Sequence, residues 1–382
     1  MIIEGKRIEC LDGLRGLAAL WVLLGHSSQL TGWRIPILSS PDLGVDLFVM
    51  LSGFLMVFHY ELRKEANPWE KPSTWFGFWL KRFFRIAPLY YVMLSVALIL
   101  GPMLYDSRMI IDHFLGHNPQ LSERYLDGSL RNFLMHASFF FGFFPSYAFR
   151  TPLPDWSLGL EMQFYAAFPF IMLLMRKFRW LVGAALVAFV AFLFATIMHA
   201  AHIGFPMPSF LPLKLHVFLC GMLLANGLFT SPRQSFASAI LAVALVMIPI
   251  GGAMTPGRVT VRVLLVVGFF ALVHHRMLPG VAGRIGERIS TLLGNRFSHW
   301  LGELSFGVYL IHLILLQPIA AFIIQHLGND ISAPIRFLMT IVVLIPLSYA
   351  LAYLGFTRVE MPGQKVGRRV LDSVGRRLLK TV

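Results

Sequence analysis

Cysteine and charge are scarce in this 382-residue sequence. Its two cysteines, Cys10 and Cys220, supply neither a disulfide framework nor the clustered ligands of a zinc site, so we expect no metal. Only 14% of the residues are charged, whereas 57% are hydrophobic, a balance outside the range of ordinary soluble domains. Long apolar runs recur from one end of the sequence to the other. The composition therefore predicts an all-α, polytopic transmembrane helical bundle.

The sequence also lacks several motifs of soluble enzymes. It has no glycine-rich phosphate loop, no His-Glu-x-x-His zinc motif and no Gly-x-Ser-x-Gly elbow, so kinase, metalloprotease and serine-hydrolase functions have no support. The formal charge of +14 could suggest a nucleic-acid partner. However, the basic residues gather in short loops between apolar runs, and no basic stripe alternates with stacking aromatics. We therefore expect a membrane lipid environment and no nucleic acid.

Ten apolar segments have spanning length, and the basic residues between them fall mostly on one side. That bias places both termini in the cytosol. We expect no cleavable signal peptide, because the first run carries Arg15 and lacks a small-residue cleavage site. Residues 1–360 then form a single integral membrane domain, and 361–382 a basic cytosolic tail. The predicted spans are 12–30, 44–61, 84–104, 157–175, 180–198, 211–228, 236–252, 259–275, 304–325 and 336–356.

Residues 131–147 do not fit this pattern smoothly. They contain an almost continuous phenylalanine run from Phe139 to Phe144, which is apolar enough to enter the bilayer. A full span here would move the basic residues 176–179 outside and invert every later loop. We therefore expect this segment to re-enter the membrane or to pack on its outer surface.

The first predicted span carries two polar side chains, Arg15 and His26. They are about three turns apart, so they share a helix face and lie roughly 16 Å apart along the helix axis. A snorkelling arginine and a histidine buried between helices would account for the pair. Ionisable groups inside a membrane also commonly mark functional sites. With the N-terminus inside, Arg15 lies near the cytosolic face and His26 in the outer half.

Three further charged positions allow two interpretations each. Asp46, near the start of the second span, either caps that helix or presents a carboxylate to an interior cavity. Arg82 and Arg85 are three residues apart at the cytosolic boundary of the third span, so they share a face. They are either positive-inside anchors or a pair of guanidinium groups suited to a polyphosphate ligand.

Two polar stripes interrupt later spans. Ser157, Glu161 and Tyr165 follow one another at intervals of four, and a glutamate this deep needs a partner or a proton. Its expected depth matches that of His26, so we predict a carboxylate that orients the histidine. Ser305, Tyr309 and His312 form the second stripe, for which a structural cluster of interhelical hydrogen bonds is the stronger single explanation.

These segments, in this order, resemble the acyltransferase-3 family of bacterial membrane-bound O-acyltransferases. The resemblance covers nearly the whole chain, and its combination of motifs is more specific than any single one. Matching positions are Arg15 and His26 as Arg-x10-His, Gly44–Phe54, Arg82 and Arg85 as Arg-x-x-Arg, Trp156-Ser157-Leu158 with Glu161 and Tyr165, Gly302–His312, and Val359–Pro362.

The resemblance implies a multi-pass enzyme of the bacterial inner membrane. Such an enzyme moves an acetyl or other short acyl group from cytosolic acyl-coenzyme A, as donor substrate, to a hydroxyl of an extracytoplasmic carbohydrate such as an exopolysaccharide, O-antigen or lipid-linked sugar. Acylation of a macrolide-type small molecule, or a transporter or flippase without enzymatic activity, are the alternatives. Many members carry a fused SGNH-type domain, and none follows here, so we expect direct transfer or a separate extracytoplasmic partner protein.

The resemblance also assigns roles. Arg15, Arg82 and Arg85 would bind the coenzyme A phosphates, and His26, supported by Glu161, would act as the base or form a transient acyl-histidine. Sequence alone does not separate those two mechanisms. The remaining matched or neighbouring polar positions would support the substrate or the structure: Asp12, Asp46, Trp156, Ser157, Tyr165, Ser305, Tyr309 and His312.

Overall fold

The computed structural model describes residues 8–66, 68–252 and 255–378, and within those ranges every regular element is a helix. The elements that correspond to the ten predicted spans are α1 (Cys10–Leu30), α2 (Pro41–Arg63), α3 (Pro72–Ile99), α7 (Trp156–Phe178), α8 (Trp180–Ala200), α9 (Leu215–Gly227), α10 (Pro232–Val246), α11 (Pro256–Val273), α13 (Arg296–Leu327) and α14 (Ala333–Gly355).

Seven of the described helices are long and apolar enough to cross a membrane: α2, α3, α7, α8, α11, α13 and the continuous helix that contains α14. The all-helical class and the multi-pass character are therefore confirmed. α9 and α10 are apolar but shorter, and α1 has 21 residues with a more polar composition. The ten-span count and the cytosolic termini stay predictions.

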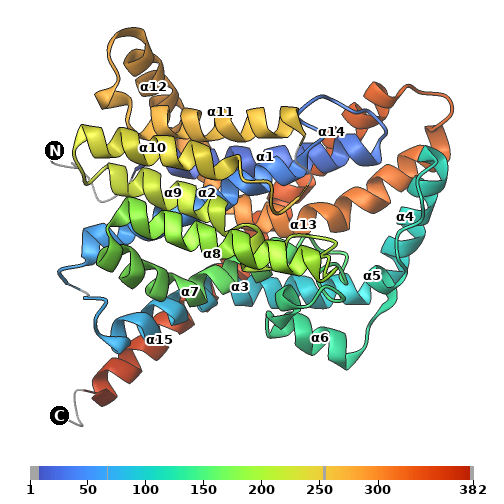
Figure 1. The fold of residues 1–382 in the computed structure, drawn as a ribbon. Helices are drawn as coiled ribbons and strands as arrows, with labels where there is room; N and C mark the ends of the chain where they lie inside the picture. The colour runs from blue at the N-terminus through green and yellow to red at the C-terminus, as the bar shows by residue number, and fades with distance from the viewer. Residues whose placement is uncertain (1–7, 67, 253–254, 379–382) are drawn as a thin grey trace.

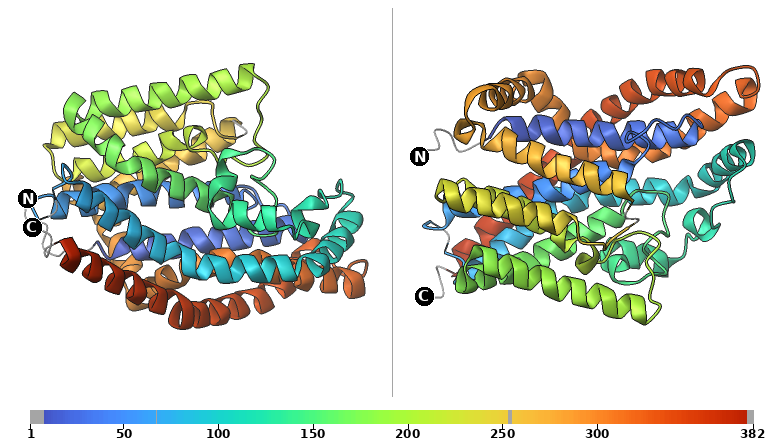
Figure 2. Two further views of the ribbon diagram at one scale, coloured as in Figure 1. Left: turned by 90° about the horizontal axis from the view of Figure 1, so that it is seen from below. Right: turned by 45° about the horizontal axis from the view of Figure 1, so that its top comes forward.

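The helices form one bundle with distinct ends. α1 begins and α15 (Met361–Leu378) ends at the same end, where α12 (Gly280–Leu293) also lies (Figures 1 and 2). The opposite end carries α4 (Gly101–Leu115), α5 (Glu123–Leu126) and α6 (Leu130–Ala137) (Figure 1). Under the predicted topology the first end faces the cytosol and the second faces outward. The large exposed side chains of α8, such as Phe189 and Val190, are apolar, as expected of a surface that faces lipid.

Local signals explain why several helices begin outside the predicted spans. The Asn295 side chain accepts a hydrogen bond from the Ser298 backbone nitrogen at 2.8 Å and so caps α13, upstream of the predicted start at 304. Proline occupies the first turn of α3, where it needs no hydrogen-bond partner. Capping extends both helices into polar sequence that hydropathy alone does not recognise.

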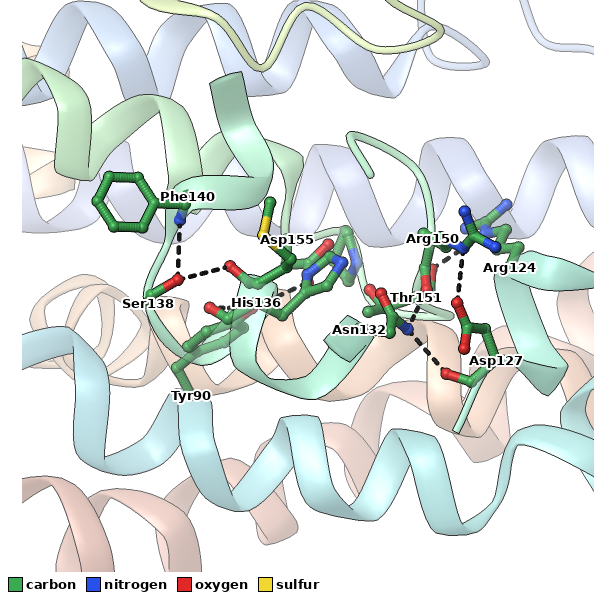
Figure 3. Close-up of polar contacts among 12 residues, drawn as sticks. Tyr90, Arg124, Asp127, Asn132, His136, Ser138, Phe140, Arg150, Thr151 and Asp155 are labelled. Atoms are coloured by element: carbon green, nitrogen blue, oxygen red, sulfur yellow. Dashed lines mark hydrogen bonds and ion pairs between the residues drawn. The ribbon is translucent and has the colours of Figure 1, made fainter. Parts of the chain in front are cut away.

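Residues 131–147 do not form a spanning helix. They contain all of α6 except its first residue, the short 3₁₀ helix η1 (Phe140–Phe143) and turns. A buried polar network anchors this segment (Figure 3). His136 Nδ1 lies 3.0 Å from Asp155 Oδ2, and the Tyr90 hydroxyl donates to the same oxygen at 3.1 Å. These contacts tie the segment to α3 and to the start of α7 at the outer end of the bundle.

Close backbone contact joins α1 to α13. A Cβ on Gly16 would meet the backbone and Cβ of Leu301, and a Cβ on Gly302 would meet the backbone of Asp12. Small residues allow membrane helices to approach this closely. The packing continues along both helices and brings His26 of α1 against His312 of α13.

The predicted basic tail is helical where the structure describes it. A single turn of π-helix, η4 (Phe356–Glu360), joins α14 to α15, and α15 packs along α3. Three further short 3₁₀ or amphipathic elements complete the fold: η2 (Leu211–Leu213), η3 (His275–Met277) and α12.

Candidate active site

One face of α2 lines three cavities that follow one another along the bundle. Val45 belongs to the outer cavity, Val45 and Ser52 to the central one, and His59 and Arg63 to the inner one. From Val45 to Arg63 the helix advances about 27 Å, nearly the thickness of a hydrocarbon core. The three cavities therefore lie in series along α2, from one end of the bundle to the other, and this series is called the route below.

The inner cavity is strongly basic. It has a volume of about 250 Å³ and is lined by His59, Arg63, Lys81 and Arg82 together with aromatic side chains. The guanidinium carbon of Arg82 lies 5.5 Å from the centre of the Tyr165 ring. Such a group of cations suits a ligand that carries several phosphates, and the predicted topology places this end in the cytosol.

The central cavity is narrow, with a volume of about 60 Å³. Arg15, Ser52, Ser157 and Glu161 line it, so the first polar stripe predicted from the sequence faces the route. Ser52 Oγ donates to Glu161 Oε1 at 2.8 Å, and the hydroxyl of Tyr165 donates to the same oxygen. Since Arg82 lies over Tyr165, this network also connects the central cavity to the inner one.

The outer cavity is wider, with a volume of about 340 Å³. His26, Trp156 and Tyr309 line it, and Val45 and Tyr309 line the central cavity too, so the two adjoin. The Tyr309 hydroxyl donates to the Pro154 carbonyl at 2.7 Å and therefore accepts from Ser157 Oγ, also at 2.7 Å. Tyr309 is fixed at the boundary between the two cavities.

His26 and His312 form a pair. Their rings stack with centroids 5.1 Å apart, and His26 Nδ1 lies 3.0 Å from His312 Nε2. His312 is fully buried, and its Nδ1 lies 2.7 Å from the Tyr309 carbonyl oxygen. A carbonyl only accepts, so Nδ1 of His312 carries the proton, and Nε2 of the neutral ring accepts from His26 Nδ1. This leaves Nε2 of His26 as the unprotonated nitrogen.

The expected contact between Glu161 and His26 is replaced by this histidine pair. In the part of the chain that the structure describes, the ionisable side chain that contacts His26 is His312, while Glu161 bonds to Ser52 and Tyr165. Counting helical turns inward from opposite membrane faces predicts the same depth for Glu161 and His26. The helices place them in adjacent cavities instead, because α13, not α7, packs along α1.

Asp46 fits neither of its two predicted interpretations. Its carboxylate is fully buried and lies 2.5 Å from Lys214 Nζ and 2.8 Å from Arg262 Nε. These ion pairs join α2 to the start of α9 and to α11. The geometry is that of a structural contact among three helices.

The two arginines of the Arg-x-x-Arg motif have different surroundings. Arg82 lines the inner cavity, whereas Arg85 Nη1 lies 3.4 Å from the buried carboxylate of Glu360 in η4. Of two other predicted positions, Asp12 contacts α13 and Ser305 makes a bond within its own helix. Asp12 Oδ2 lies 4.0 Å from His299 Nε2, and Ser305 Oγ donates to the Gly302 carbonyl one turn earlier at 2.7 Å.

Sequence reasoning missed several residues of the route. Ser52, His59 and Arg63 lie on one face of α2, at intervals of seven and four, which is a helical signal that the sequence did contain. Arg124, Gln120 and Gln317 of the outer cavity come from distant segments. No spacing in the sequence relates them to His26.

The arrangement has two chemically different ends. Cations at the inner end can hold phosphates, and an imidazole with a free nitrogen at the outer end can take a proton from a hydroxyl. A family model for an acyltransferase domain matches residues 8–353. The chain belongs to the acyltransferase-3 family. Apart from Val359–Pro362, the motifs that suggested this family from the sequence lie within the matched region.

Several proteins similar to this acyltransferase-3 chain carry acyltransferase names. It is 27% identical to the peptidoglycan O-acetyltransferase OatA of Listeria monocytogenes, over 45% of this chain and 25% of that protein. It is 25% identical to the acyltransferase MdmB of Streptomyces mycarofaciens, over 81% of this chain and 79% of that protein. The chain thus covers only a quarter of the first relative and most of the second. No solved structure matches it significantly.

Proposed function

We propose that the protein transfers an acetyl or other short acyl group from acyl-coenzyme A at the cytosolic face of the bacterial inner membrane to a carbohydrate hydroxyl on the outer face. The three aligned cavities carry this proposal, because basic side chains line the inner one and His26 lines the outer one. Family membership and the name of the Listeria relative support the same chemistry.

The donor binds from the inner end in this proposal. Arg63, Lys81 and Arg82 hold its phosphates, and the flexible arm of the donor extends past Arg15 toward Tyr309. The central cavity is too narrow for this arm as it stands, so its side chains move apart on binding. Arg85 supports the inner end through Glu360.

The reaction takes place where the central and outer cavities meet. Nε2 of His26 accepts the proton of the acceptor hydroxyl as the oxygen attacks the thioester carbonyl carbon. The carbon–sulfur bond breaks, and coenzyme A leaves as a thiolate that takes the proton from Nε2 of His26, which restores the neutral imidazole. His312 acts as a positioning residue, because its acceptor nitrogen keeps the proton of His26 on Nδ1 and leaves Nε2 free. An acyl-histidine formed on the same nitrogen is the competing route.

A transport assay with purified protein tests this proposal. Protein in liposomes receives acetyl-coenzyme A with a labelled acetyl group on one side and a soluble peptidoglycan fragment on the other. We expect release of free coenzyme A thiol on the donor side and a labelled ester on the acceptor side. Thiol release that does not depend on the acceptor, with no labelled glycan, would contradict the proposal. Trapping of label on His26 in the absence of acceptor would favour the acyl-histidine route.

A further inference from the structure

A buried arginine in the outer cavity has no carboxylate partner. Arg124 of α5 is 8% exposed and lines the cavity together with His26. Its Nε donates to the Thr151 carbonyl at 3.2 Å, and its guanidinium carbon lies 3.7 Å from the centre of the Phe149 ring. Among the described residues, none of the aspartates or glutamates is within ion-pair distance of it. Its Nη1 also donates to Gln120 Oε1 at 3.4 Å. These neutral acceptors and a ring face only partly offset the cost of burying this charge.

Nearby carboxylates already have other partners. Figure 3 shows Arg150 beside Arg124, and Asp127 pairs with Arg150 at 2.7 Å. Asp112 binds Arg108 through both carboxylate oxygens at 2.9 Å. Each of these pairs is balanced within itself, so none neutralises Arg124.

The other charged side chains of the outer cavity do not neutralise Arg124 either. Its one lining carboxylate, Asp42, pairs with Arg258. An adjoining groove shares Gln29 and Arg108 with the cavity and adds Arg34, which also has no ion pair among the described residues. Among the described residues, Arg124 and Arg34 are therefore cations of this region without an ion pair. The buried carboxylate of Asp155, next to Trp156 of the cavity, bonds instead to His136 and Tyr90.

We propose that the carbohydrate acceptor is anionic, and that its carboxylate or phosphate binds Arg124 while the hydroxyl to be acylated reaches His26. This inference rests on the proposed function and names the substrate class of the same site. A guanidinium held in place by Phe149 and Thr151 can form charge-assisted hydrogen bonds to either anion. The Gln29 side chain and the rings of Trp156 and Tyr309 then contact the neutral parts of the sugar.

Binding to the full-length protein in detergent tests the inference without the reaction. Isothermal titration compares a glucuronic acid disaccharide, the matched glucose disaccharide and glucose 1-phosphate, in the absence of donor. We expect the wild type to bind at least one anionic sugar about tenfold or more tightly than the neutral disaccharide. Which of the two anionic sugars binds more tightly indicates whether the site prefers a carboxylate or a phosphate.

Three variants assign the preference to Arg124. Arg124→Gln should lose the preference for anionic over neutral sugars. Arg124→Lys should keep part of that preference, because an ammonium retains the charge but not the forked geometry. Arg131→Gln is the matched control, since Arg131 is an exposed arginine at the same end that is not among the residues lining the cavity. It should keep the wild-type preference. If Arg124→Gln fails to fold, the wild-type comparison still decides the question.

Equal binding of charged and neutral sugars by the wild type would overturn the inference. Equal weakening of all three sugars in Arg124→Gln would overturn it too, because that result indicates a purely structural role. Acetyl transfer to neutral and charged sugars alike would leave the proposed function intact and refute only the inference. Preferential anion binding without any acetyl transfer would support the anion site and refute the proposed function.

Discussion

His26 Nδ1 lies 3.0 Å from His312 Nε2, although 286 residues separate the two histidines in the chain. The carbonyl of Tyr309 fixes the proton of His312 on the far side of that ring. Two neutral imidazoles therefore form a chain of directed hydrogen bonds that ends at the free nitrogen of His26. In many hydrolases a carboxylate performs this orienting role, and here an uncharged ring can perform it within the membrane at a lower desolvation cost.

The first prediction concerns His26 itself. His26→Ala should lower acyl transfer by about 10²–10⁴-fold, the usual contribution of a general base, while the protein remains folded. The control is His326→Ala, which removes an exposed histidine at the outer end of α13. Transfer is measured as labelled ester formed per minute, with thermal unfolding as the check on folding. Turnover in His26→Ala close to that of His326→Ala would rule out both roles considered for His26.

The second prediction separates positioning from packing at His312. The side-chain amide of glutamine lies near the position of the imidazole Nε2 and can accept a hydrogen bond there, whereas alanine has no acceptor. We expect His312→Gln to keep more of kcat than His312→Ala, with the affinity for coenzyme A unchanged in both. A loss of coenzyme A affinity that parallels the loss of kcat would indicate a general packing defect instead.

The third prediction distinguishes Arg82 from Arg85. Arg82→Ala should raise the dissociation constant for coenzyme A by about ten- to a hundredfold, because charge-assisted hydrogen bonds contribute about 1.5–3 kcal/mol. Arg82→Lys should recover part of that affinity. Arg85→Ala should chiefly lower the thermal midpoint, since it leaves the buried carboxylate of Glu360 without its cation. Titration calorimetry and thermal unfolding of the same preparations measure both effects. Identical affinity losses in the two alanine variants would contradict this division.

The fourth prediction treats Asp46 as a structural residue. Asp46→Ala removes the carboxylate that contacts two buried cations, Lys214 and Arg262, and should destabilise the fold by about 3–5 kcal/mol. Glu70→Ala is the control, because Glu70 forms an exposed pair with Arg176 that contributes about 0–1 kcal/mol. Thermal unfolding in detergent gives the comparison. A normal midpoint combined with lost transfer in Asp46→Ala would instead support a role in the reaction.

The fifth prediction tests the orientation of α7, on which the two-sided reaction depends. Single cysteines replace Phe178 or Ile203, both of which are exposed, in a background that lacks Cys10 and Cys220. In intact cells an impermeant thiol reagent should label position 203 and leave position 178 unlabelled until the membrane is opened. Labelling of position 178 from outside would invert this part of the topology, and with it the proposed sides of donor and acceptor.

The sequence by itself determined the class of the fold and most of the helices. Apolar runs of spanning length have few alternatives to a helix in a membrane, because the backbone must satisfy its own hydrogen bonds there. The same regularity placed Ser157, Glu161 and Tyr165 on one helix face, since a helix fixes the directions of its side chains. Charge alone also predicts that residues 131–147 re-enter the membrane or pack on its surface, and the structure has α6, η1 and turns there in place of a spanning helix.

Only the tertiary structure decided which polar groups meet. His26 faces His312 because Gly16 and Gly302 let α1 and α13 approach closely, and no periodicity within either helix contains that information. For the same reason Arg85 pairs with Glu360 and Asp46 with Lys214, contacts between segments far apart in the chain. A helix pattern gives the face on which a side chain lies. The helix that packs against that face depends on the complementarity of whole surfaces, which exists only in the folded bundle.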